Sequence, residues 1–250
     1  MNIRGIVLRG IVCAAMAVFV PALVSATCSN ATLNGVYGYH HGRFGGSALF
    51  QEVMGQFTAD GAGNISAGSW TKSYTGTITT GTTVGTYSIS ADCAGTITLD
   101  TEDEPTPSHY NIFLDNQNTG FQMTQTDYNT DQPGEGQALG TATCSVPGQK
   151  QVFAANFQTE FPLLESIVGQ VVFDGQGNLS GQASFSIDLV KFSTAVNGTY
   201  SENSDCTGTV TMEVSGRPTM HFNSVTVNSG RELYLLETDP GTILAGTAQQ

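Results

Sequence analysis

The four histidines are the first residues to consider for acid–base or metal chemistry, and their spacing argues against a metal site, while acid–base pairs assembled from distant residues stay open. His40 and His41 are adjacent on an expected strand, so their side chains point to opposite faces and cannot ligate one ion. His109 and His221 recur at matching positions of an internal repeat. We expect both to have hydrogen-bonded structural roles, because no acid or cysteine recurs at a helpful spacing beside them. The sequence therefore assigns no catalytic residue and no metal ligand, and it implies no cofactor.

Acidic residues occur in two glycine-rich segments that are similar to parts of calcium loops, at residues 60–64 and 174–178. An EF-hand loop ends in a glutamate at its twelfth position, which neither segment supplies, so we interpret both as hairpin turns. The acidic run at residues 102–104 is expected to be a solvated loop. Trp70, the single tryptophan, has no counterpart in the second half of the chain. It is expected either to pack in the core or to stack on a ligand.

The two halves of the chain repeat one another. Residues 55–66 match residues 169–180 at an offset of 114 without a gap. Residues 92–98 match 205–211 at an offset of 113, and residues 109–111 match 221–223 at 112. Ordered matches at a nearly constant offset indicate two copies of one domain, which we place at residues 27–143 and 144–250.

Residues 1–26 have the features of a secretory signal peptide. Arg4 and Arg9 are followed by an apolar stretch and a small-residue cleavage site at Val24-Ser25-Ala26. No later segment is long enough to span a membrane, so the mature chain is expected to be periplasmic or extracellular without a membrane span. The net charge of −13 argues against a nucleic-acid partner, because such proteins need a basic face.

Four cysteines remain after the leader, and an even number in an exported chain predicts disulfides. Each copy has one cysteine at its start and one 65 or 62 residues later. Equivalent domains should form equivalent bridges, which predicts Cys28–Cys93 and Cys144–Cys206. No Cys-x-x-Cys pair is present to suggest a metal site instead.

Short runs of threonine, tyrosine, valine and isoleucine alternate with glycine, asparagine and aspartate, as in all-β domains. In the first copy we expect strands near residues 33–41, 48–58, 65–73, 83–90, 95–101, 108–116, 120–127 and 137–143. The predicted fold class is all-β, with two tandem copies of a small antiparallel, up-and-down β-barrel of about eight strands. A β-sandwich is the alternative architecture.

In such a barrel the tight turns and the cysteines lie at one end, and the longer connections lie at the other. Binding residues concentrate on loops that a rigid scaffold holds. In the second copy the longer connections are expected at residues 158–166, 187–195, 214–220 and 239–242. The candidate ligand-binding residues in these connections are apolar: Phe161, Leu163, Leu164, Val190 and Phe192.

Three segments of the second copy, at residues 197–200, 205–209 and 237–242, resemble exported bacterial Gly/Thr-rich two-repeat β-barrel proteins of unassigned function. Those proteins are lipocalin-like or allene-oxide-cyclase-like in outline. Gly35-Val36-Tyr37 and Thr126-Asp127-Tyr128 are similar to the lipocalin Gly-x-Trp and Thr-Asp-Tyr motifs, although the tryptophan is missing. The resemblance implies a barrel fold and transfers no functional residue.

These observations predict an exported, non-catalytic two-barrel protein that binds a small apolar ligand or an envelope partner at the long-loop end. The alternative is a structural or adhesive protein of the cell envelope without a small-molecule ligand. An isomerase or cyclase activity is a third hypothesis, motivated by the fold resemblance alone.

Overall fold

A computed structural model describes residues 27–43, 50–115, 117, 119–127, 132–140, 144, 150–161, 165–188 and 190–250. The expected signal peptide at residues 1–26 lies outside the described residues. A short 3₁₀ turn, η1 (Asn30–Thr32), precedes the first barrel. The strands of barrel 1 are β1 (Asn34–Arg43), β2 (Gln51–Asp60), β3 (Asn64–Tyr74), β4 (Thr77–Ile89), β5 (Ala94–Thr101), β6 (Ser108–Leu114), β7 (Gly120–Gln125) and β8 (Pro133–Ala138).

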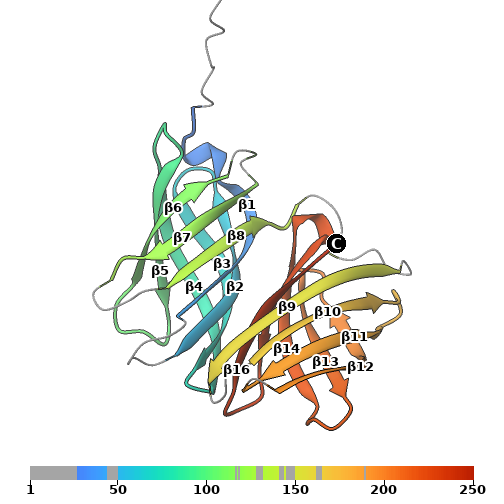
Figure 1. Ribbon diagram of the computed structural model, residues 1–250. Coiled ribbons are helices and arrows are strands. Elements are labelled where there is room, and N and C mark those ends of the chain that lie inside the picture. The colour runs from blue at the N-terminus through green and yellow to red at the C-terminus, as the bar shows by residue number, and fades with distance from the viewer. Residues whose placement is uncertain are drawn as a thin grey trace, which may run out of the picture.

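Barrel 2 repeats this arrangement, with a second 3₁₀ turn, η2 (Asn228–Gly230), between its sixth and seventh strands. Its strands are β9 (Gln151–Phe161), β10 (Glu165–Phe173), β11 (Asn178–Ile187), β12 (Val190–Glu202), β13 (Thr207–Val214), β14 (Met220–Val227), β15 (Glu232–Glu237) and β16 (Ile243–Gln249). In each barrel every strand pairs antiparallel with its sequence neighbours, and the last strand closes on the first. The all-β fold of two tandem eight-stranded barrels is therefore confirmed, and Figure 1 shows the barrels side by side.

Alternation along the strands separates the interior of each barrel from its outer surface. On β1, Tyr37 and Tyr39 point inward into a buried cluster that also contains Phe57, Ile97 and Phe121. The interior of barrel 2 is built mainly from phenylalanine, methionine and aliphatic residues, among them Phe153, Phe157 and Phe222. Each barrel thus has a core of its own.

The two Asp-Gly-x-Gly-Asn segments form hairpin turns, as expected. The side chain of Asp60 accepts hydrogen bonds from the backbone nitrogens of Ala62 and Asn64 at 2.7 and 2.9 Å, and from the Asn64 amide at 2.6 Å. Asp174 makes the same three bonds in the second copy. These bonds come first among the causes that lower the pKa of Asp60 to about 2. The carboxylates therefore stabilise the turns.

Several expected long loops are strands instead. The segment expected as a loop at residues 74–82 contains only a two-residue turn, because β3 ends at Tyr74 and β4 begins at Thr77. Thr75 and Gly76 both have positive φ, as a tight hairpin requires. The threonine-rich segment after them has high β propensity, which the presence of Gly81 obscured in the sequence. The second copy behaves alike, since β11 and β12 extend to Ile187 and from Val190.

Both predicted disulfides are present, and both lie at the end of the barrel that we call the floor. Cys28 is bonded to Cys93, and Cys144 to Cys206, with Cα–Cα distances of 5.0 and 4.9 Å. The two bridges indicate an oxidising environment. The opposite end of each barrel, with the connections between strands 1–2, 3–4, 5–6 and 7–8, is called the mouth.

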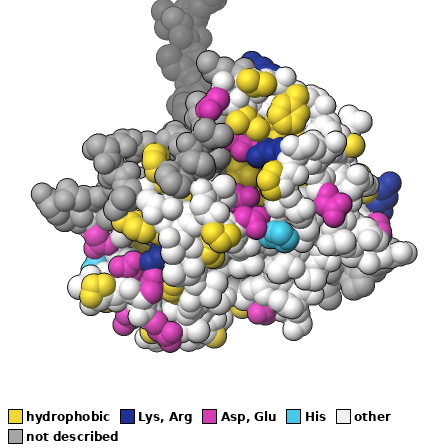
Figure 2. All heavy atoms as spheres, turned by 90° about the horizontal axis from the view of Figure 1, so that it is seen from below, with side chains coloured by type: hydrophobic (Ala, Val, Ile, Leu, Met, Phe, Trp, Pro, Cys, Tyr) yellow, Lys and Arg dark blue, Asp and Glu magenta, His cyan; other side chains and the backbone are white. Residues whose placement is uncertain are grey.

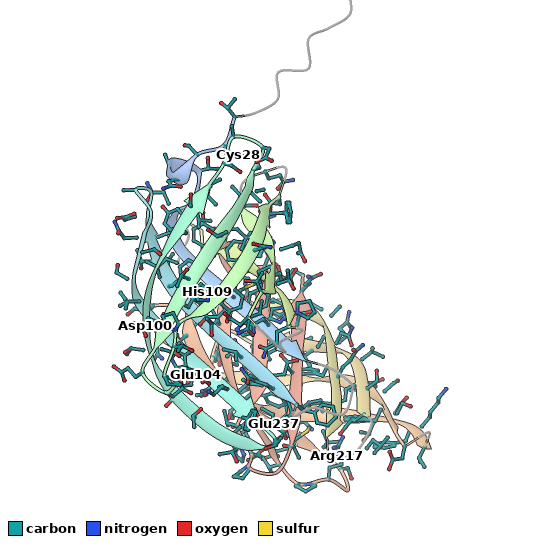
Figure 3. The ribbon with its side chains drawn as sticks, turned by 90° about the vertical axis from the view of Figure 1, so that its left-hand side faces the viewer. Cys28, Asp100, Glu104, His109, Arg217 and Glu237 are labelled. Atoms are coloured by element: carbon teal, nitrogen blue, oxygen red, sulfur yellow. A yellow bond between two sulfur atoms is a disulfide. The ribbon has the colours of Figure 1, made fainter. Side chains whose placement is uncertain are left out.

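The barrels pack against each other through their outer walls. Met54 and Leu139 of barrel 1 form a buried cluster with Val225, Val227 and Tyr234 of barrel 2. Hydrogen bonds join the barrels at both ends: Ser229 N donates to the Leu139 carbonyl at the floor, and Gly241 N to the Gly76 carbonyl at the mouth. The two mouths therefore open in the same direction, which Figure 3 shows by placing Glu104 and Arg217 at the ends remote from Cys28.

Candidate functional site

The mouth of barrel 1 contains a cavity of about 250 Å³ that reaches down to the buried core. Strands β1, β2, β3, β5, β6 and β7 supply its walls, and the β5–β6 connection lies at its rim. The side chains that line it include Tyr39, His41, Val53, Trp70, Lys72, Leu99, Asp103, Glu104, Ser108, Tyr110, Gln125, Asp127 and Gln132. The set combines aromatic rings with hydrogen-bonding and charged groups, which is typical of a ligand site.

Three buried polar side chains in the lining of this cavity form a hydrogen-bonded chain. His41 Nδ1 lies 2.8 Å from Gln132 Oε1, and the Tyr110 hydroxyl lies 3.1 Å from His41 Nε2. Because the amide oxygen can only accept, Nδ1 carries the proton and Nε2 accepts from Tyr110. Burial lowers the pKa of His41 to about 4, so its ring is neutral at pH 7. Burial also raises the pKa of Tyr110, which therefore keeps its proton.

Aromatic rings form one side of the cavity. The rings of Tyr39 and His41 are nearly parallel, with centroids 6.1 Å apart. The Trp70 indole is held by a hydrogen bond of 3.0 Å from Nε1 to the Thr82 carbonyl. Gly81 makes room for it, because a Cβ there would lie 2.6 Å from the indole ring. Trp70 thus packs in the barrel core, one of the two roles expected for it, and it also lines the cavity; stacking on a ligand stays a prediction.

Lys72 ties the β5–β6 connection across the mouth. Its ammonium group pairs with Asp103 and lies 2.8 Å from Glu104, while it also sits 5.5 Å from the Trp70 ring centroid. Burial alone would lower the pKa of Lys72, but the two carboxylates outweigh it and raise the pKa. The acidic run at 102–104 is an exposed turn, as expected, and its residues Asp103 and Glu104 also form an ion-pair cluster with Lys72.

His109 and Asp127 form a clasp between β6 and the end of β7 that recurs in the second copy. His109 Nδ1 lies 2.7 Å from Asp127 Oδ1, and the His109 backbone nitrogen donates to Oδ2 at 2.9 Å. His221 and Asp239 repeat both contacts at 2.8 Å. The hydrogen-bonded structural role expected for the two histidines is thus present. Acids do recur beside them, and the matching Thr-Asp pairs at 126–127 and 238–239 were the available signal.

Barrel 2 carries phenylalanine at three positions where barrel 1 has polar cavity residues. In barrel 1, Val53 pairs with His41 on one side and with Lys72 on the other. Its repeat in barrel 2, Ile167, pairs with Phe157 and with Phe185. His41 therefore corresponds to Phe157, and Lys72 to Phe185. Likewise, Tyr110 lies opposite Ile97, and Phe222 lies opposite Val210, the repeat of Ile97. The ring centroids of His41 and Tyr110 are 5.2 Å apart, and those of Phe157 and Phe222 are 5.3 Å apart. The corresponding space in barrel 2 has shrunk to about 20 Å³.

An ion pair also crosses the mouth of barrel 2, but here the cation lies in the connection and the carboxylate on the strand, the reverse of barrel 1. Arg217, in the β13–β14 connection, pairs with Glu165 of β10, with Nη2 3.0 Å from Oε2, and lies over the Phe185 ring. Nearby, burial raises the pKa of Glu237 to about 7, although Thr242 donates a 2.6 Å hydrogen bond to it. Figure 3 shows Glu237 and Arg217 at this end, and Figure 2 shows acidic side chains spread over the lower face of the molecule.

The structure describes only part of the apolar set that the sequence analysis selected in the second copy. Leu163 and Leu164 lie outside the described residues, and Phe161 ends strand β9. Val190 and Phe192 lie on β12 and not in a loop; they are 66% and 37% exposed, and Phe192 stacks on Phe185 at 5.0 Å. A ligand role for these residues stays a prediction.

His41, Lys72 and Tyr110 were not selected from the sequence. The signal that could have found them is the exchange of a polar for an apolar residue between copies, as in His-Tyr-Asn at 109–111 against His-Phe-Asn at 221–223. Among the described residues, no group of three or more His, Cys, Asp or Glu side chains is placed to hold a metal ion. No helix in the described part of the chain is long and apolar enough to cross a membrane.

Comparison with known proteins gives a structural neighbour and no family. No family model matches the sequence, and no curated protein matches it. Among solved structures, the chain is similar to kievitone hydratase from Nectria haematococca, with a TM-score of 0.31 and 8% identity. That match covers 90% of this chain and 93% of the hydratase chain.

Proposed function

We propose that this protein is an exported small-molecule-binding protein whose ligand occupies the mouth of barrel 1. The observation that carries the proposal is the difference between the two copies. The same fold accommodates Phe157 and Phe222 where barrel 1 has His41 and Tyr110, at the same ring spacing. A barrel of this type therefore does not need polar atoms at these positions.

Burying polar groups costs free energy that their hydrogen bonds only offset, and replacing both partners by apolar groups of similar shape is nearly neutral, so stability alone does not require the polar set. In barrel 1 the polar residues surround a cavity of about 250 Å³, whereas the phenylalanines fill the equivalent space of barrel 2. The polar residues and the open space occur together. Ligand binding accounts for both, and barrel 2 serves as the packed companion domain.

Trp70 gives a direct test, because it is the single tryptophan of the chain and lines the cavity. The full chain, purified without reductant, is titrated with a library of small neutral fragments while tryptophan emission and the melting temperature are recorded. We expect some fragments to shift the emission of Trp70 and to raise the melting temperature with the same concentration dependence.

Two double variants complete the experiment. His41→Phe/Tyr110→Phe gives barrel 1 the residues of barrel 2, so it should fold and lose the binding by at least about tenfold. The reciprocal variant Phe157→His/Phe222→Tyr should leave the binding in barrel 1 unchanged. The proposal is refuted if no fragment acts on Trp70, or if binding persists undiminished in His41→Phe/Tyr110→Phe. In that case the structural or adhesive alternative gains support.

A further inference from the structure

We propose that the barrel 1 cavity selects ligands that donate a hydrogen bond, from a hydroxyl or N–H group carried on a flat apolar body, and rejects anions. This inference rests on the proposed function and names the chemical class of its ligand. It follows from the direction of the hydrogen bonds around the cavity, from the charges at its rim and from its aromatic walls.

The chain of hydrogen bonds through His41 has a fixed direction. Gln132 Oε1 accepts from His41 Nδ1, which leaves His41 Nε2 as an acceptor for the Tyr110 hydroxyl. The single proton of Tyr110 is then used inside the protein. What its oxygen offers toward the cavity is a lone pair, which a ligand can only meet with a donor.

Two neighbouring side chains, Ser108 and Gln125, also offer hydrogen-bond acceptors to the cavity. The Ser108 side chain is within hydrogen-bonding reach of Tyr110 and, when it donates to the phenol oxygen, also offers lone pairs to the cavity. Gln125 donates its amide nitrogen to Asp127 at 2.9 Å, and its buried side-chain oxygen has no partner among the described atoms. Tyr110, Ser108 and Gln125 therefore all present acceptor atoms that a donor on a ligand could meet.

The charged groups that line the cavity add a negative potential. Asp103, Glu104 and Asp127 are three carboxylates, and Lys72, which already pairs with the first two, is the one cation among the lining residues. His109 lies on Asp127 at the outside, with about half of its side chain exposed. An anionic ligand would meet three carboxylates and one ammonium group in a partly desolvated site, which is costly.

The apolar part of the cavity favours a flat molecule. The Tyr39 ring and the Trp70 indole stand in its wall, and Leu99 and Val53 complete the apolar surface. Offset stacking on such rings is worth about 1 kcal/mol beyond area burial, or about fivefold in affinity. A two-ring hydrocarbon with one hydroxyl group fits these requirements.

The test uses three matched probes: 2-naphthol, its methyl ether 2-methoxynaphthalene, and 2-naphthoate. Binding to the full chain is measured by isothermal titration calorimetry at pH 7, because the probes themselves absorb and emit light near the tryptophan bands. We expect 2-naphthol to bind at least about tenfold more tightly than the methyl ether, because the ether leaves buried acceptors unpaired. We expect 2-naphthoate to bind more weakly than either.

Two variants locate the preference in the hydrogen-bonded chain. Tyr110→Phe, which introduces the residue found at Phe222, should reduce the preference for naphthol over the ether to about twofold or less. His41→Phe frees the proton of Tyr110 for the ligand, so the ether should bind more tightly than it does to the unaltered protein. A merely structural role for His41 would weaken both probes alike.

The outcomes separate the inference from the proposed function. If the ether binds as tightly as naphthol, or if naphthoate binds best, the ligand class is wrong while binding in barrel 1 stands. If neither naphthol nor the ether binds but other fragments act on Trp70, the ligand class is again wrong. If no fragment acts on Trp70 at all, the proposed function fails and this inference fails with it.

Discussion

The Tyr110 hydroxyl and the His41 imidazole are hydrogen-bonded at 3.1 Å inside barrel 1, where both side chains are almost completely buried. The equivalent pair in barrel 2, Phe157 and Phe222, has the same ring spacing without any polar atom. The same position in the fold is thus occupied by a polar pair in one barrel and by an apolar pair in the other. Exchanging residues between the two pairs therefore introduces side chains that this fold already contains.

The first prediction concerns acid stability. Burial lowers the pKa of His41 to about 4 from its ordinary 6.5, so the unfolded chain binds a proton that the folded chain refuses. The free energy of unfolding is therefore unaffected by His41 titration above pH 6.5, and it falls as the pH drops from 6.5 toward 4. His41→Phe removes this loss. We expect the unfolding free energy of His41→Phe, relative to the unaltered protein, to rise by about 3 kcal/mol from pH 7 to pH 4.

Urea unfolding at each pH measures this difference, and it cancels the contribution of other titrating groups. Phe157→His is the matched control, because it places a second histidine at the equivalent position of barrel 2 and should steepen the loss toward acid. A pH-independent difference between His41→Phe and the unaltered protein would contradict a neutral buried His41.

The second prediction concerns Glu52, which is 2% exposed on the outer face of β2, and whose Oε1 atom has no hydrogen-bond partner among the described atoms. Burial raises its pKa to about 8 from 4.5, so the folded chain holds a proton that the unfolded chain releases. Its contribution to stability is present below pH 4.5 and is lost as the pH rises through 8. Glu52→Gln should therefore gain about 4 kcal/mol over the unaltered protein between pH 5 and pH 9.

The same urea experiment at pH 5 and pH 9 measures this gain. Glu135→Gln is the comparison variant, because Glu135 lies 28% exposed beside His40 and Gln122 and its pKa is lowered by these bonds. Its removal should give no gain at pH 9. An equal response of the two variants would show that Glu52 is solvated in the folded chain.

The third prediction concerns Tyr234 in the wall between the barrels. Its side chain is fully buried against His40, with ring centroids 4.6 Å apart, and its hydroxyl has no hydrogen-bond partner among the described atoms. Removing an unsatisfied buried hydroxyl should stabilise the protein, so Tyr234→Phe is expected to raise the unfolding free energy by about 1 kcal/mol. Tyr87→Phe should do the opposite by a similar amount, because the Tyr87 hydroxyl donates to the Leu33 carbonyl at 2.7 Å. Thermal unfolding of the two variants side by side tests the difference in sign.

The fourth prediction compares the disulfides. They close loops of 65 and 62 residues, so the chain-entropy model gives each a stabilisation of about 4 kcal/mol. Cys28→Ser/Cys93→Ser and Cys144→Ser/Cys206→Ser should therefore lose similar amounts in chemical denaturation. A large inequality would mean that one floor is held together mainly by its packing.

Much of the fold could be predicted from the sequence because the signals for it are local or repeated. Turn residues such as Asp60 and Asn64 form hydrogen bonds with each other within five residues. The duplication reduced the three possible pairings of four cysteines to the one that gives each copy the same bridge. The start of β4 at Thr77 was missed, because Thr75 takes a left-handed conformation that is uncommon for threonine.

The candidate site could not be predicted in the same way, because its parts are far apart in the chain. Gln132 and Tyr110 meet His41 only when β1 pairs with β8 and the barrel closes, over separations of 91 and 69 residues. Apolar residues at the loops of the second copy drew the prediction there. The deciding feature, an open space in one barrel and a filled one in the other, depends on side-chain volumes that sum across many strands.

The interface between the barrels also affects whether the two barrels unfold together or separately. Met54, Leu139 and Val227 are buried by the neighbouring barrel, so unfolding either barrel alone would expose apolar surface on the one that remains. We therefore expect the two domains to melt cooperatively, and a calorimetric enthalpy that matches the van't Hoff enthalpy of the whole chain would show it. The second barrel, whose own interior is filled, would then raise the temperature at which the first barrel unfolds.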